Sequence, residues 1–281
     1  MRVTSVELRP EGSSEAIELS FRDPKNQDVY QVKSIAPLDA DELTPQFYGT
    51  SGDSSKRYYN LAAKARQPVV LIGLNPRFGG TATESSYSAL RDRLYKIIQS
   101  SRTGVVWIVF KADSEEVAAI SGTVSKVEAA HFTEKPEVQI TFNCSDPMLK
   151  ALNRLELVPG DQIFVNDLVI VDPVSTAAHG FRFRVGFLEA FPSIVISPPG
   201  NEWKFDIRPH GGYLMGDWLY FSSENRNKYL YIQRGATKIQ LADVIQPGSI
   251  WPIIFPGSNT FHFNKPAVFT TVDHYPTFWG V

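Results

Sequence analysis

The sequence has a single cysteine, Cys144, among 281 residues. One thiol cannot form a disulfide within the chain, and it cannot supply the several sulfur ligands of a cysteine-based zinc site. Cys144 follows the apolar positions Val138, Ile140 and Phe142, and an unpaired cysteine usually behaves as a small buried hydrophobic residue. We therefore predict a core residue here, in a protein whose folding does not depend on an oxidising compartment.

Long apolar runs are also missing. The best of them, residues 105–110 (VVWIVF) and 250–255 (IWPIIF), have the length of strands, whereas a helix that spans a bilayer needs about 18 apolar residues or more. The first twenty residues are too polar and too acidic for a signal peptide. We expect a soluble protein, made in the cytoplasm, without a membrane anchor.

Neither sign of charge dominates. The chain has 28 Lys and Arg against 30 Asp and Glu, a net charge of -2, and no run of basic residues. A nucleic-acid-binding face usually shows as a basic patch or a high isoelectric point, so we expect none. A composition of 43% hydrophobic and 21% charged residues is that of a globular protein, and the length suits two domains.

Signatures of catalysis are absent from the sequence. It has no G-x-S-x-G turn, and the pairs Gly79-Gly80 and Gly211-Gly212 lack the strand-to-helix context of a phosphate-binding loop. Glu115-Glu116 predicts a solvated charge pair. Carboxylates that act together can come from distant strands, so the sequence leaves a glycosidase-like pair open. We predict no enzyme and no cofactor.

The five histidines are scattered along the chain, and no two stand at metal-ligand spacing on one predicted element. We interpret each as a surface residue or as a hydrogen-bonded core residue, and we predict no metal site. These residues are His131, His179, His210, His262 and His274.

Short alternating segments dominate the first half and predict β-strands. They occur within residues 1–38 and at residues 69–74, and residues 137–143 place Val138, Ile140 and Phe142 on one face. Residues 117–127 predict a further strand or hairpin with Gly122 at a bulge or bend. The polar residues 39–66 predict a long loop or an extended arm.

One segment of the first half differs, because residues 85–110 predict an amphipathic helix that leads directly into an apolar strand. Ser85 or Ser86 can cap the start of this helix, and Thr103-Gly104 ends it. A helix with one apolar stripe must pack against another surface, and the sheet that follows is the simplest one. The apolar stripe consists of Tyr87, Leu90, Leu94, Ile97 and Ile98.

Residues 148–157 (MLKALNRLEL) predict a short connector with a turn or two of helix. We place the domain boundary here, with domains at residues 1–147 and 148–281. Strands separated by turns rich in Gly, Pro and Asn follow, and this spacing predicts a β-sandwich or barrel. The expected strands are residues 163–171, 181–187, 193–197, 203–208, 217–222, 229–233, 238–241, 251–255, 260–263 and 267–273.

Aromatic residues make up 12% of the chain, and two interpretations of them are open. Trp218 and Tyr220 alternate with Leu219 and Phe221, which predicts a central strand buried on both faces. Aromatic rings of this kind usually fill a core or a subunit interface, but rings on one sheet face can also stack on sugars. The tryptophans of the second half are Trp203, Trp218, Trp251 and Trp279.

Two motifs of the first half occur in a fixed order. The helix carries an S-x-L-R-D-R-L-Y pattern, and the segment at residues 138–147 has the form V-x-I-x-F-x-C-x-D-P. The residues of these motifs are Ser88, Leu90, Arg91, Asp92, Arg93, Leu94 and Tyr95, then Val138, Ile140, Phe142, Cys144, Asp146 and Pro147. Both motifs resemble the distal tail protein family of siphophages, and residues 29–35 (VYQVKSI) resemble an early strand of that family.

The second half resembles the galectin-like sandwich of the same family. Gly216-Asp217 begins a G-D-x-L hairpin motif that Arg226 follows, and Pro256-Gly257-Ser258-Asn259 matches a P-G-x-N turn. No long insertion interrupts this half, so the resemblance implies no inserted carbohydrate-binding module. The motifs occur in the family's order over nearly the whole chain.

The resemblance implies a mainly β fold, with a tail-tube-like N-terminal β-sandwich or barrel flanked by one helix and a galectin-like C-terminal β-sandwich. It implies a structural virion protein that forms a hexameric ring at the end of a long non-contractile tail. The partners would be the tail tube protein, the baseplate hub or tail-associated protein, and receptor-binding proteins on the outside. The tape-measure protein and DNA would only pass through the lumen.

Two other functions compete with this prediction. The second domain could be a carbohydrate-binding module that contacts the host cell wall, which exposed Trp or Tyr residues on one sheet face would favour. The chain could also be a glycoside hydrolase or an esterase whose catalytic residues converge only in the folded protein.

Overall fold

The structure is a computed structural model of the chain. It describes residues 3–21, 29–38, 43–48, 57–63, 65–76, 86–101, 103–129, 136–156, 162–164, 167–197, 203–224, 227–245 and 251–278. The chain divides into two compact units, the first ending at Leu152 and the second running from Asn153 to Phe278. In the described residues both units are built mainly from strands, which confirms the predicted fold class.

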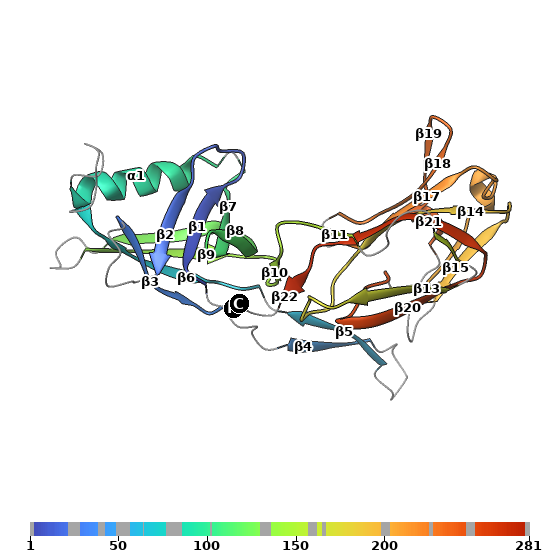
Figure 1. The fold of residues 1–281 in the computed structure, drawn as a ribbon, viewed down its shortest axis with the longest axis horizontal. Coiled ribbons are helices and arrows are strands. Elements are labelled where there is room, and N and C mark those ends of the chain that lie inside the picture. The colour runs from blue at the N-terminus through green and yellow to red at the C-terminus, as the bar shows by residue number, and fades with distance from the viewer. Residues whose placement is uncertain are drawn as a thin grey trace. The chain divides into compact units, whose positions relative to one another are not determined.

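The first unit is a closed β-barrel (Figure 1). Its strands follow the order β8-β7-β1-β2-β3-β6-β9, and β9 pairs with β8 again, so the sheet has no free edge. Only β2 and β3 run parallel in this circuit. The strands are β1 (Ser5–Pro10), β2 (Ile17–Phe21), β3 (Tyr30–Ala36), β6 (Val69–Leu74), β7 (Val105–Ala112), β8 (Glu115–Ala129) and β9 (Glu137–Asn143).

The period-2 pattern of the sequence accounts for the barrel core. In β9, Val138, Ile140 and Phe142 are buried, while Gln139 and Thr141 between them are partly exposed, as predicted. The alternation is incomplete in β1, where Ser5 and Glu7 are buried together with Val6 and Leu8, and in β7, where Ile108, Val109 and Phe110 are all buried.

The predicted helix is α1 (Tyr87–Gln99), which lies beside the barrel strands (Figure 1) and contacts β1 and β6. Ser86 caps it, because its Oγ accepts a hydrogen bond from the backbone N–H of Ala89 at 3.2 Å. Leu90, Leu94, Ile97 and Ile98 are buried as predicted. Tyr87 is instead 44% exposed, because helical side chains point back toward the N-terminus and a ring in the first turn overhangs the end.

Three expectations for the first half need correction. Residues 39–66, predicted as a long loop or an extended arm, are not simply a loop, because they contain a hairpin, β4 (Leu43–Tyr48) paired with β5 (Arg57–Ala63). The supposed helical connector contains two short strands, β10 (Leu149–Lys150) and β11 (Leu155–Glu156), whose partners are β8 and β21. Gly122 is not at a bulge: it pairs in register with Val106, and the irregularities of β8 lie between Glu116 and Ala118 and between Val124 and Lys126.

The second unit is a β-sandwich. One sheet has the order β11-β21-β14-β17-β18-β19 with β12 added to β21, and the other has the order β13-β20-β15-β16. Its strands are β12 (Gln162–Phe164), β13 (Asp167–Asp172), β14 (Arg182–Phe187), β15 (Ser193–Ser197), β16 (Trp203–Asp206), β17 (Trp218–Ser222), β18 (Tyr229–Arg234), β19 (Thr237–Gln240), β20 (Gly257–Phe263) and β21 (Ala267–His274). Short 3₁₀ turns at Arg208–His210 and Ala242–Val244 complete it, and the last described strand, β22 (Thr277–Phe278), belongs to neither of its two sheets.

Aromatic rings from both sheets form the core of the sandwich. Phe181 and Phe183 of the larger sheet meet Phe261 and Phe263 of the smaller one, with ring centroids 5.0 and 6.0 Å apart. Trp203 is fully buried beside Phe221 at 5.0 Å. Such contacts stabilise a core beyond the area that they bury.

Three predicted elements of the second half also need correction. Residues 163–171 are not one strand, because β12 pairs with β21 and β13 pairs with β20 of the other sheet. Residues 251–255 form no strand and contribute only an isolated bridge from Ile254 to His179. The predicted turn at residues 256–259 ends early, since β20 begins at Gly257. Among the described residues, no helix is long and apolar enough to span a membrane.

Candidate functional site

The motif residues of the helix divide between its two faces. Leu90 and Leu94 are buried, and the carbonyl of Leu90 accepts a hydrogen bond from the hydroxyl of Tyr30 at 3.0 Å, which ties the helix to β3. Arg91 and Tyr95 are partly exposed, and Asp92 is exposed. The outer residues are therefore available at the surface of this unit, while the inner ones hold the helix in place.

Cys144, Asp146 and Pro147 form the turn that ends β9. Cys144 is fully buried, as predicted, and its backbone exchanges two hydrogen bonds with Arg66 at 2.8 and 3.0 Å. Burial raises the pKa of its thiol to about 11. Asp146 accepts hydrogen bonds from the backbone N–H of Met148 at 3.3 Å and from Lys150 at 2.6 Å.

Gly216 and Asp217 close the loop before β17. Gly216 has a φ of 93°, in the region that favours glycine. The carboxylate of Asp217 is buried, accepts a hydrogen bond from the backbone N–H of Leu214 at 3.0 Å and pairs with Arg234 at 2.7 Å.

The second motif of this unit lies at the start of β20. Pro256 is exposed, and Gly257 has a φ of 91°. The side-chain amide of Asn259 exchanges hydrogen bonds of 2.8 and 2.7 Å with the backbone of Phe255.

The structure therefore does not gather the described motif residues into one site. They lie at a helix, at strand ends and in turns of two separate units. Those of the helix divide between core and surface, while several of those in turns and at strand ends contact nearby backbone.

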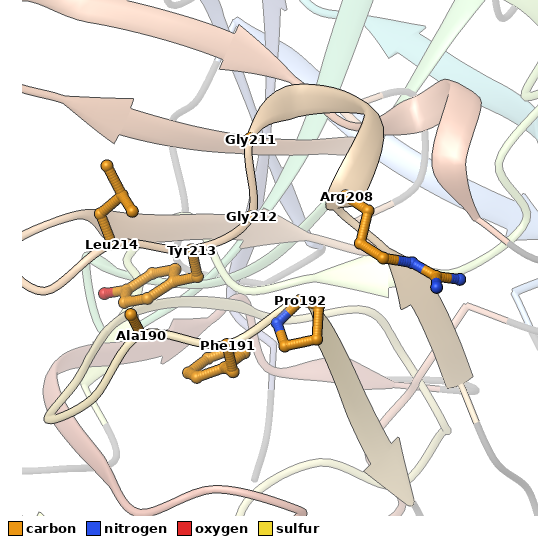
Figure 2. Close-up of a pocket in the computed structure, with 8 residues that line it drawn as sticks. All are labelled: Ala190, Phe191, Pro192, Arg208, Gly211, Gly212, Tyr213 and Leu214. Atoms are coloured by element: carbon orange, nitrogen blue, oxygen red, sulfur yellow. The ribbon is translucent and has the colours of Figure 1, made fainter.

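The loop closed by Asp217 lines an open pocket of about 380 Å³ (Figure 2). Tyr213 and Phe191 stack at its base with ring centroids 4.9 Å apart. The hydroxyl of Tyr213 accepts a hydrogen bond from the backbone N–H of Phe187 at 2.9 Å and donates to the carbonyl of Asp217, so it is not available to a ligand. The lining residues are Ala190, Phe191, Pro192, Arg208, Gly211, Gly212, Tyr213 and Leu214.

This pocket lacks the groups of an acid–base or nucleophilic site. Arg208 is its one charged lining residue, and its lining includes no carboxylate, imidazole or thiol. Burial raises the pKa of Tyr213 to about 12, so the phenol stays protonated at neutral pH. No sequence motif marked this pocket, because its residues are mostly apolar or glycine and come from separate turns.

The aromatic residues divide between the core and the outer face of the larger sheet. Trp203 is buried, and Trp251 packs against it with ring centroids 5.3 Å apart, which agrees with the core interpretation. Trp218 and Tyr220 lie on the opposite face of β17 and are partly exposed, so the prediction of burial on both faces is wrong. Trp279 lies outside the described residues.

On this outer face, cations lie over the aromatic rings. The guanidinium of Arg184 is 4.2 Å from the centroid of Trp218 and 5.4 Å from that of Tyr220. Tyr220 stacks on Tyr231 at 4.7 Å, and the ammonium of Lys238 is 4.0 Å from the Tyr231 ring. A sugar that stacked on these rings would have to displace a cation from them.

Among the four histidines that the structure describes, three pair with a carboxylate, and two contact each other. His210 is 3.2 Å from Asp243, and His262 is 2.6 Å from Asp167, both at the surface. His179 and His274 stack in the interior beside Asp172. The sequence missed this last group because strand pairing joins residues that are 95 positions apart. His131 lies outside the described residues.

Comparison with solved structures identifies the fold. The chain is similar to the Dit protein of phage SPP1, with a TM-score of 0.56 and 14% identity over 97% of this chain and 99% of that one. That protein is described as a paradigm of the hub adsorption apparatus in phages that infect Gram-positive bacteria. A chain of the phage P2 baseplate in its activated conformation with Ca matches at 11% identity and a TM-score of 0.41, over 96% of this chain and 98% of that one.

No family model and no curated protein matches the sequence. The likeness to the SPP1 protein extends over nearly the full length of both chains, so both units are included. The predicted resemblance is thus confirmed at the level of the fold.

Proposed function

We propose that the chain is a distal tail protein of a long-tailed phage. It is a structural virion component at the tip of a non-contractile tail, assembled in the host cytoplasm, and it joins the tail tube to the baseplate hub. The observation that carries the proposal is the fold match to the SPP1 Dit protein over 97% of this chain. The sequence motifs that resemble the family, from Ser88 to Asn259, agree with it.

The oligomer that we propose is a hexameric ring formed by the first unit. The barrel is closed by strand pairing and leaves no free edge among its own strands, so the ring contacts have to come from surface residues and appended segments. The hairpin β4–β5 is such a segment, because among the described strands each of its two pairs only with the other. An isolated two-stranded hairpin is marginally stable, and packing against a neighbouring copy would stabilise it.

The partners follow from this position. One face of the ring would meet the last ring of tail tube protein, and the other would meet the hub or tail-associated protein. The second unit would lie outside and hold receptor-binding proteins. DNA would only pass through the lumen, which agrees with a net charge of -2 and no basic run. The protein would act without catalysis or cofactor.

The test is the mass of the purified chain in solution, measured by light scattering after size exclusion and followed by negative-stain imaging. Six copies of the 31.4 kDa chain give a particle of about 190 kDa, and the images should show rings.

A matched pair of variants tests whether the hairpin forms the contact between copies. Replacing residues 43–63 with a short Gly-Ser linker should abolish the ring and leave the far-UV spectrum of a folded β protein. Met215→Ser, at a side chain that is 78% exposed in the second unit, should leave the ring intact. A chain that stays monomeric both alone and when mixed with assembled tail tubes would contradict the proposal.

A further inference from the structure

A buried group of three possible metal ligands lies at one end of the sandwich. Asp172 is the last residue of β13, His274 is the last residue of β21, and His179 lies in the segment that leads into β14. Their side chains are almost completely buried, and one ligand atom from each lies within 4.8 Å of the other two. The nearest approaches are 2.5 Å between His179 Nε2 and His274 Nδ1 and 3.5 Å between His179 Nε2 and Asp172 Oδ2.

Hydrogen bonds to the backbone hold two of these side chains in position. Asp172 Oδ1 accepts the backbone N–H groups of Val174 and Ser175, at 3.1 and 3.0 Å. His179 Nδ1 donates to the carbonyl of Ala177 at 2.9 Å. Because a carbonyl can only accept, this bond places the proton on Nδ1 and leaves Nε2 of neutral His179 with a lone pair. Such a bond to the far nitrogen is the usual support of a metal-binding histidine.

Hydrogen bonds within the group leave one oxygen of its carboxylate without a donor. Asp172 Oδ2 and His274 Nε2 are buried atoms without a hydrogen-bond partner. A single proton shared between His179 Nε2 and His274 Nδ1 satisfies those two atoms, but it gives Asp172 Oδ2 no donor. A buried carboxylate oxygen without a donor or a cation is costly, so the arrangement is explained better by a positive charge among the three atoms.

The residue types suit a metal ion, because a carboxylate oxygen and imidazole nitrogens are common ligands of divalent transition metals.

We propose that Asp172, His179 and His274 bind one divalent transition-metal ion, of which Zn²⁺ fits best. Zinc binds histidine nitrogen and carboxylate oxygen at about 2.0–2.2 Å, usually in a tetrahedron, which places ligand atoms roughly 3.3 Å apart. The observed 2.5 and 3.5 Å lie on either side of that value, so small side-chain shifts complete the site. Coordination by His274 Nδ1 requires its proton on Nε2.

Such an ion would cross-link the two sheets of the sandwich. Asp172 ends a strand of the smaller sheet, and His274 ends a strand of the larger one. His179 adds the segment that pairs with Ile254 through backbone hydrogen bonds of 3.0 and 2.9 Å. Metal binding to the folded state alone stabilises it in proportion to the logarithm of metal concentration over Kd. This inference does not depend on the proposed function.

The test uses the full chain without a histidine tag, freed of metal with a chelator and then titrated with zinc sulfate at pH 7.5. We expect one zinc ion per chain in competition with a chromophoric chelator, a higher melting temperature in equimolar zinc, and a visible absorption band of a four-coordinate site with Co²⁺. Asp172→Asn keeps the oxygen that caps Val174 and Ser175 and should weaken zinc binding at least tenfold. His274→Gln is the second variant, in case the first does not fold.

The matched control is His262→Asn, which removes an exposed histidine that also lies beside a carboxylate, Asp167. It should bind zinc like the wild-type chain. Equal zinc affinity in the wild type and Asp172→Asn, loss of binding in His262→Asn, or no zinc-dependent change in the melting temperature of the wild type would each overturn the proposal. If zinc did not change the melting temperature of the wild type, a proton rather than a metal ion would lie among the three side chains.

Discussion

Arg234 binds the carboxylate of Asp217 through two nitrogen atoms, with Nη2 2.7 Å from Oδ2 and Nε 3.1 Å from Oδ1. The same Nη2 donates to the carbonyl of Gly212 at 2.6 Å. One guanidinium on β18 therefore holds both ends of the loop that lines the pocket. Gly212 and Gly216 have positive φ, and these hydrogen bonds add to the backbone pairing of Tyr213 with Phe191 in holding the loop.

We predict that Asp217→Asn lowers the free energy of unfolding of the second unit by about 2 kcal/mol. The substitution removes the charge of a buried partner and leaves a partly buried Arg234 without its counter-ion. Trp203, Trp218 and Trp251 lie in this unit, so tryptophan fluorescence in a urea titration measures the change.

The control for this prediction is Glu189→Gln, which breaks an exposed pair with Lys265. Exposed pairs contribute about 1 kcal/mol at most, so the urea midpoint should move little. Equal shifts for the two variants would show that the Asp217–Arg234 pair does not hold the loop.

Gly122 tests the packing of the barrel. A Cβ at this position would lie 2.7 Å from the sulfur of Cys144 and 2.9 Å from the backbone oxygen of Asn143. Since backbone cannot yield as a flexible side chain can, Gly122→Ala should destabilise the first unit by about 1–3 kcal/mol.

Gly73→Ala is the matched control for Gly122→Ala, because there the nearest atoms belong to the flexible end of Lys33. Scanning calorimetry of both variants measures the difference in melting temperature. If the two alanine variants melted at the same temperature, the close approach of β9 to Gly122 would be refuted.

The thiol of Cys144 should not react in the native protein. It is fully buried, and burial raises its pKa to about 11, so at pH 8 the nucleophilic thiolate is scarce and enclosed. Iodoacetamide followed by mass spectrometry should find no modification in buffer and complete modification in guanidinium. Stoichiometric labelling of the native chain would contradict the burial.

The sequence predicted those parts of the fold that depend on local periodicity. Alternation identified β9, helical spacing with Ser86 identified α1, and the apolar run identified β7. It failed where partners are distant. Nothing local separates β12 from β13, which pair with different sheets, and the polar composition of residues 39–66 concealed the pairing of β4 with β5.

The candidate sites were less predictable than the fold. The resemblance named motif residues but not their contacts: Asp217 and Asn259 hold loops, and only the structure reveals their partners Arg234 and Phe255. The group of Asp172, His179 and His274 has no spacing signature, because topology rather than sequence distance brings its members together.

The outer face of the larger sheet provides the last prediction, which also bears on saccharide binding. Arg184 lies over Trp218 and Tyr220, and its buried Nε has no hydrogen-bond partner, so its contacts with the rings are its main attachment. Arg184→Met should cost about 1 kcal/mol through the lost cation–π interaction, while Arg184→Lys should cost a similar amount because an ammonium cannot stack as a planar group. Urea unfolding measures the stability of both variants.

A carbohydrate-binding face would behave differently. Removing the cation would expose the rings, and Arg184→Met would bind cell-wall polysaccharide more tightly than the wild type in a pull-down. We expect neither chain to be retained, since a ring face that the protein itself covers is built for stability rather than for a sugar.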